Sequence, residues 1–131
     1  MNNNLILKWL LIVGGLVEII IGILFLFIPY ALSSIGLPQI PFFSQMAGSF
    51  LLGFGILLLY SSKRVEIFRI VPLVNILIRF IMIGFSLLSI PSYPEFVVIL
   101  IPAILYDLVW SILFLYLLDK ENLLFPNAKN E

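Results

Sequence analysis

Four long hydrophobic stretches, separated by short polar or proline-containing segments, make up almost the whole chain. They cover residues 9–28, 42–60, 70–90 and 96–118. Each holds about 20 residues, which is the length at which a helix crosses the hydrocarbon core of a bilayer. The pattern therefore predicts four membrane-spanning helices, and residues 119–131 are expected to form a polar cytoplasmic tail.

Three prolines bear on where the predicted helices begin, end or bend. Pro29 is expected to end the first helix, and the uncharged segment PYALSSIGLPQIP, residues 29–41, is expected to be a loop. Pro72 falls in the first turn of the third stretch, where a missing N–H is harmless. Pro102 lies inside the fourth stretch and is expected to kink a helix that its neighbours support.

Composition separates this chain from soluble proteins. Hydrophobic residues make up 63% of it and charged residues only 11%, whereas a soluble domain holds about 25% charged residues. A signal peptide is the competing interpretation of the first stretch, but its apolar region would span about 7–15 residues, and this stretch is longer and contains Glu18. We expect an all-α integral membrane four-helix bundle, up-down-up-down, in a single transmembrane domain covering residues 1–131.

The charges and missing residue types exclude several functions. Seven basic and seven acidic residues give a net charge of zero, which argues against a nucleic-acid partner. The chain contains neither Cys nor His, so thiol catalysis, iron–sulfur centres and a Ser–His–Asp triad are excluded, and the commonest metal ligand is missing. No cofactor and no metal are expected, and an enzyme is the less favoured reading.

The basic residues also predict an orientation. Six of them fall on the side shared by the two termini and the second loop: Lys8, Lys63, Arg64, Arg69, Lys120 and Lys129. The positive-inside rule then places both termini in the cytoplasm. The expected location is the inner membrane of a bacterium.

Three charged residues lie near the centres of hydrophobic stretches: Glu18 in the first, Arg79 in the third and Asp107 in the fourth. Each costs roughly 2.5–3.5 kcal/mol at the centre of an isolated membrane helix. Because antiparallel packing would bring the three to one depth, we expect them to share a polar core with Asn75.

Helical geometry predicts which residues accompany these charges. Glycines at positions 14, 15 and 22 share the face of Glu18 and would let a partner helix approach closely. Small residues at positions 48, 49, 53 and 55 suggest close packing of the second helix, and Ser49 is a further candidate for the polar core. Tyr106 and Trp110 lie beside Asp107, and Ser111 aligns with it.

Two interpretations of this core stay open. In the first, Arg79 bridges both acids and holds the helices in register, since the forked donors of arginine suit carboxylates. In the second, the charges form a ligand site or a proton path, as intramembrane ionisable groups commonly do. The excess of acid favours the second interpretation, because burying an extra negative charge is costly.

The order of motifs resembles a known family. An acid in the first stretch precedes a proline-ended helix, the second stretch contains GSFLLGFG, the third holds Arg79, and the fourth contains YDLVW at 106–110. This order resembles the BphX-like and DoxX-like small four-helix membrane proteins of bacteria. The resemblance implies a four-helix bundle without an established enzymatic activity, in which Glu18, Arg79 and Asp107 match polar residues kept inside.

These observations leave four hypotheses. The favoured one is a bundle that binds a small amphipathic or apolar molecule, or a lipid. The candidate ligand-binding residues are Glu18, Ser49, Asn75, Arg79, Tyr106, Asp107 and Trp110. The alternative is an assembly factor or accessory subunit that packs on a membrane-protein partner. A proton-coupled transporter, acting as a homodimer, and an intramembrane isomerase are less favoured, because four short helices leave little room for alternating access and no spacing singles out proton-transfer chemistry.

Overall fold

Four long helices account for most of the chain. The computed structural model describes residues 3–36 and 41–124. The helices are α1 (Asn3–Ser34), α2 (Pro41–Ser61), α3 (Ile70–Ser89) and α4 (Val97–Lys120), with a short 3₁₀ helix η1 (Pro94–Phe96) before α4. No strand occurs in the part of the chain that the structure describes, so the predicted all-α class is confirmed.

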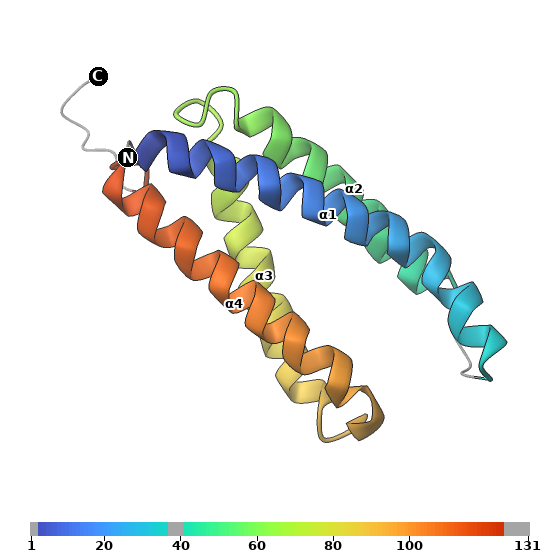
Figure 1. The fold of residues 1–131 in the computed structure, drawn as a ribbon. Coiled ribbons are helices and arrows are strands. Elements are labelled where there is room, and N and C mark those ends of the chain that lie inside the picture. The colour runs from blue at the N-terminus through green and yellow to red at the C-terminus, as the bar shows by residue number, and fades with distance from the viewer. Residues whose placement is uncertain (1–2, 37–40, 125–131) are drawn as a thin grey trace. The chain divides into compact units, whose positions relative to one another are not determined.

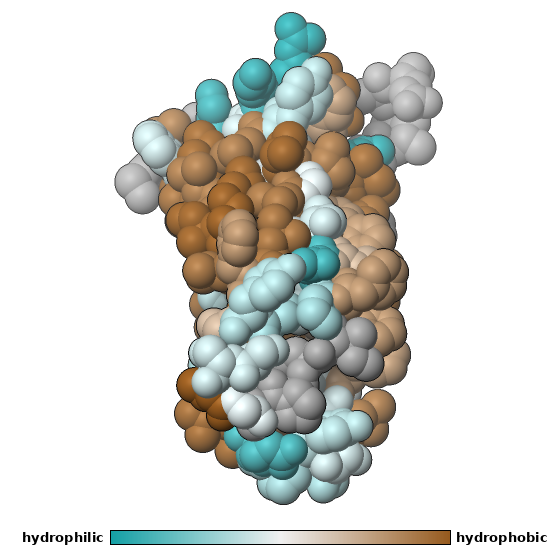
Figure 2. Space-filling model, turned by 90° about the vertical axis from the view of Figure 1, so that its right-hand side faces the viewer, coloured by the Kyte–Doolittle hydropathy of each residue, from teal (hydrophilic) through white to brown (hydrophobic). Residues whose placement is uncertain are grey.

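All four long helices are long and apolar enough to cross a membrane, which indicates an integral membrane protein. Large apolar side chains are exposed along every one of them, including Phe27, Phe50, Phe85 and Val98. Figure 2 shows a broad hydrophobic area on one face, with hydrophilic residues at its upper edge. A soluble monomer rarely exposes apolar patches of this extent, whereas lipid covers such a surface.

The chain divides into two compact units, which are described separately. The α1–α2 unit comprises residues 8–64, and the α3–α4 unit comprises residues 65–131 together with residues 1–7. Within each unit two long helices run side by side in opposite directions (Figure 1). The expectation of one domain with a common core for all four helices stays a prediction.

Two reciprocal glycine pairs join α1 and α2. A Cβ atom on Gly15 would lie 2.7 Å from the carbonyl oxygen of Gly55, and one on Gly22 would lie 2.8 Å from the carbonyl oxygen of Gly48. The two backbones therefore touch, as small residues permit in lipid. The predicted close packing at these positions is confirmed, whereas a Cβ on Gly53 would meet nothing within 4 Å.

The predicted end of the first helix at Pro29 is wrong, because α1 continues to Ser34. The hydroxyl of Ser33 donates to the carbonyl oxygen of Pro29 at 2.7 Å, and the hydroxyl of Ser34 donates to that of Ala31 at 2.6 Å. Gly36 then adopts a φ of 81°, the left-handed conformation that commonly ends a helix. Glycine rather than proline is thus the stop signal.

The other boundaries follow the hydrophobic pattern. Pro72 lies in the first turn of α3, and Pro102 lies inside α4 without ending it. At the end of α4, Asn122 has a φ of 55°, and the Leu123 N–H donates to the Leu118 carbonyl oxygen at 2.8 Å. This is a Schellman-type cap with asparagine in the left-handed position. The predicted tail therefore begins after Lys120, and its residues 125–131 lie outside the described part.

Candidate functional site

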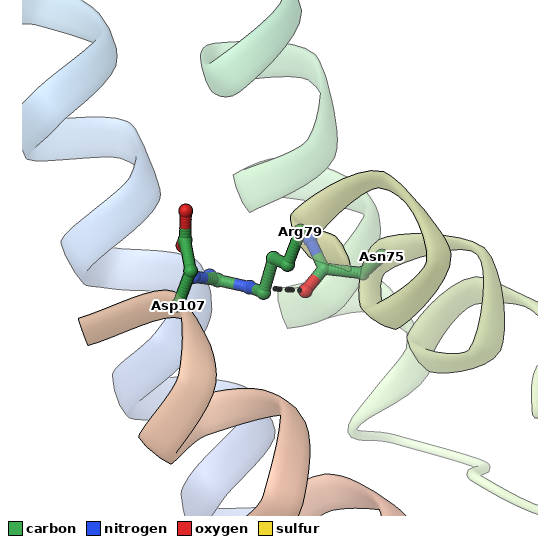
Figure 3. A network of polar contacts seen from close by, with 3 residues as sticks. All are labelled: Asn75, Arg79 and Asp107. Carbon is green, nitrogen blue, oxygen red and sulfur yellow. Dashed lines mark hydrogen bonds and ion pairs between the residues drawn. The ribbon is translucent and has the colours of Figure 1, made fainter. Parts of the chain in front are cut away.

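An ion pair connects the middles of α3 and α4. Nη1 of Arg79 lies 2.5 Å from Oδ1 of Asp107, and Figure 3 shows the guanidinium lying between the carboxylate and Asn75. Only 6% of the Arg79 side chain is exposed, compared with 21% of the Asp107 side chain. Two of the three charges predicted to share a site are therefore in direct contact.

Asn75 orients the arginine. It lies one helical turn before Arg79 on α3, and its Oδ1 accepts a hydrogen bond from Arg79 Nε at 2.8 Å. Residues four apart on a helix share a face, so the predicted alignment of these two residues is confirmed. With Nε held by Asn75 and Nη1 held by Asp107, the plane of the guanidinium is fixed from both sides.

A row of aromatic rings extends from the ion pair along α4. The guanidinium carbon of Arg79 lies 5.1 Å from the centre of the Tyr106 ring, within the range of a cation–π contact. Trp110 meets Tyr106 edge-on at 6.0 Å and stacks on Phe114 at 5.7 Å. Tyr106 therefore contacts the ion pair directly, and Trp110 and Phe114 support its ring from the next two turns.

Ser111 lies on α4, one turn after Asp107, as the helical geometry predicts. It is fully buried, and its hydroxyl oxygen has no hydrogen-bond partner among residues 3–36 and 41–124. A hydroxyl buried in this way lowers the stability of a fold. The sequence predicts the position of this hydroxyl but not its missing partner.

Glu18 is buried in the middle of α1, with 3% of its surface exposed. Leu11, Gly15 and Gly22 share its buried face, as the helical geometry predicts. Glu18 belongs to the α1–α2 unit, while Arg79 and Asp107 belong to the α3–α4 unit. Its expected contact with that ion pair therefore stays a prediction.

Ser49, a candidate for the polar core, contacts neither Arg79 nor Asp107 through any hydrogen bond that the structure shows among the described residues, so its place in that core stays a prediction. Its side chain is exposed on α2, and its hydroxyl donates to the carbonyl oxygen of Gln45 at 2.9 Å. The face of α2 that packs against α1 is the one that carries Gly48 and Gly55. Ser49 is exposed beside this face rather than on it.

Ser49 instead borders an open hollow of about 490 Å³ on α2, which the sequence did not indicate. The other lining residues are Phe42, Gln45, Met46 and Phe50. Nε2 of Gln45 donates a hydrogen bond to the hydroxyl of Tyr30 at 3.2 Å, which links the start of α2 to α1. The polar character of this hollow comes only from an amide and a hydroxyl.

No protein-family model, curated protein or solved structure matches this chain. Its functional assignment therefore depends on the chemistry of the site. An ion pair at membrane depth with an aromatic neighbour can orient a polar head group while the rest of a molecule stays in apolar surroundings.

Proposed function

We propose that this protein binds a small amphipathic molecule or lipid at the Arg79–Asp107 ion pair. The observation that carries the proposal is the unequal burial of the pair, since Arg79 is enclosed whereas a fifth of the Asp107 side chain stays exposed. If the pair only held α3 and α4 together, apolar residues of similar size would do so equally well. A partly exposed carboxylate at this depth is better explained by an occupant that uses it.

The surroundings of the pair support binding over catalysis. The contacts of Arg79 with Asn75 and Tyr106 hold it in place, which suits a fixed recognition site. The chain has no His, the residue that most often shuttles protons near neutral pH, and no Cys to serve as a thiolate nucleophile. Binding without chemical conversion is therefore the simpler assignment.

Native mass spectrometry of the protein released from lipid nanodiscs tests this function. The parent is expected to retain a small molecule, and the double variant Arg79→Leu/Asp107→Leu is expected to fold and to lose it, because the polar anchor is gone. An equally occupied double variant, or a parent that carries nothing, would contradict the proposal. Circular dichroism of the double variant supplies the control for folding.

A second candidate, an assembly factor or accessory subunit, is favoured by one observation. Gly53 and Gly84 would each accept a Cβ without contact within 4 Å among the described residues, so packing inside the protein does not require glycine there. A helix of another membrane protein could use this space. Co-purification of one defined membrane protein, lost in Gly53→Leu, would support this candidate.

The proposal includes an orientation and a family. Lys63 and Lys120 lie over the rings of Tyr60 and Tyr116 near the ends of α2 and α4, and basic residues near such helix ends favour the cytoplasmic side. We further propose a bacterial inner membrane and, from the order of the motifs alone, kinship with the BphX-like and DoxX-like four-helix proteins. A cysteine at Ser34 or Ser92 should react with an impermeant reagent from outside, and one at Lys63 only after permeabilisation; the reverse pattern would overturn the orientation.

A further inference from the structure

The basic half of the ion pair is closed to a ligand. Nε of Arg79 is bonded to Asn75, Nη1 is bonded to Asp107, and the ring of Tyr106 faces the guanidinium. Only 6% of the side chain is exposed. A carboxylate or phosphate head group would therefore have to displace an existing partner before it could contact this arginine.

The acidic half of the pair is more accessible. Asp107 exposes 21% of its side chain and uses Oδ1 for Arg79. Within the described part of the chain, the structure shows no other hydrogen bond to this carboxylate, so Oδ2 can accept one. An ionised carboxylate only accepts hydrogen bonds, and the polar group of a ligand at this position must therefore be a donor.

The charge of the site further limits which hydrogen-bond donor the ligand can carry. Arg79 and Asp107 neutralise each other as a pair, so a cationic head group would bring a charge that this pair does not balance, at a depth where charge is costly. A neutral hydroxyl group supplies a hydrogen-bond donor without adding a charge. The exposed apolar residues of α4 beside Asp107, such as Leu108 and Leu105, suit a hydrocarbon body.

We propose that the occupant is a neutral, hydroxyl-bearing hydrophobic molecule, of the class of long-chain alcohols and diacylglycerols, whose hydroxyl donates to Oδ2 of Asp107. This inference rests on the proposed function, because it names the chemistry of the ligand at the same site. It goes further by stating that the ligand contacts Asp107 rather than Arg79, and that the site excludes anionic head groups.

Photolabelling with four matched probes tests the inference. Each probe is a twelve-carbon chain with a diazirine, and the chains end in a hydroxyl, a methyl ether, a primary ammonium or a sulfonate. The intact protein in nanodiscs is labelled with each probe, and the labelled peptides of α4 are quantified by mass spectrometry. We expect the alcohol to label α4 at least about fivefold more than the ether, which cannot donate, and about tenfold more than the sulfonate, which Asp107 repels.

Two variants assign the labelling to Asp107. Asp107→Asn keeps the shape but loses the charge-assisted acceptor, so alcohol labelling should fall about fivefold. In Arg79→Leu/Asp107→Leu it should fall to the level of the ether. Asp119→Asn, on the exposed end of the same helix, serves as the matched control and should label like the parent.

The outcomes separate the two proposals. Equal labelling by alcohol and ether, or a preference for ammonium or sulfonate that depends on Asp107, would overturn the inference and leave a binding site of other chemistry. If none of the four probes labels α4 in a manner that depends on Asp107, the proposed function fails as well, and the inference fails with it.

Discussion

The two units of this protein hold their helices together by different means. In the α1–α2 unit, glycine backbones touch at Gly15–Gly55 and Gly22–Gly48, and a side-chain hydrogen bond joins Tyr30 and Gln45 near one end. In the α3–α4 unit, the ion pair of Arg79 and Asp107 lies between the middles of the helices.

This difference illustrates the energetics of packing in lipid. Burying apolar side chains drives little association there, because lipid tails are as apolar as leucine. Helices must therefore pair by close backbone contact or by polar contacts. Close contact needs only that side chains be small, whereas a charge pair fails when either partner is lost. The α3–α4 unit is thus expected to be the more sensitive to single substitutions.

The largest effect is expected from separating the ion pair. Asp107→Leu leaves the buried Arg79 without its carboxylate, which should cost about 3–5 kcal/mol of unfolding free energy. The double variant Arg79→Leu/Asp107→Leu should recover much of that loss. Unfolding in mixed micelles with increasing dodecyl sulfate, followed by circular dichroism, gives both values. An Asp107→Leu variant as stable as the parent would show that the pair does not hold this unit together.

A smaller effect is expected from a methyl group at a glycine contact. In Gly48→Ala the new Cβ would lie 2.6 Å from the carbonyl oxygen of Gly22, so the helices must separate at a cost of about 1–3 kcal/mol. Gly53→Ala, on the same helix in open space, is the matched control and should be neutral or slightly stabilising. Equal losses in the two variants in the same unfolding experiment would argue against backbone contact as the cause.

The smallest of these effects concerns the ring that faces the guanidinium. Tyr106→Leu removes the cation–π contact with Arg79 and should cost about 0.5–2 kcal/mol. Tyr106→Phe keeps the ring and should retain most of the stability. In a Trp9→Phe background, both can be compared with the parent through the fluorescence of Trp110, whose ring meets Tyr106. If the phenylalanine variant loses as much as the leucine variant, the ring is not the stabilising group.

Much of the fold follows from hydrophobic length alone. The predicted second, third and fourth spans end within one or two residues of α2, α3 and α4, because apolar stretches of membrane length have few other structures available. The end of α1 differs from the prediction, because a proline inside a membrane helix removes only one backbone donor and does not have to end the helix. Gly36, with its left-handed conformation, marks the end of α1 that the prediction assigned to Pro29.

The site was predictable in part. The four-residue spacing of Asn75 and Arg79 places them on one face, and the depth of Asp107 makes it a natural partner for the arginine. Arg79 uses Nε for the Asn75 amide and Nη1 for the Asp107 carboxylate. This choice of donors depends on side-chain geometry, which a sequence does not give. On α2 the glycines, rather than Ser49 and Gln45, mark the face that packs against α1, and the role of Ser49 stays a prediction.

The position of the ion pair also bears on how the chain enters a membrane during synthesis. Arg79 and Asp107 are 28 residues apart in the sequence, on helices joined by the short segment 90–96. Either charge alone would raise the cost of transferring its helix from the translocation machinery into lipid by roughly 2.5–3.5 kcal/mol. A hairpin that forms before release carries both charges into the bilayer already neutralised. Insertion of α3 is therefore tied to the arrival of α4, since a chain interrupted before Asp107 lacks the carboxylate that pairs with Arg79.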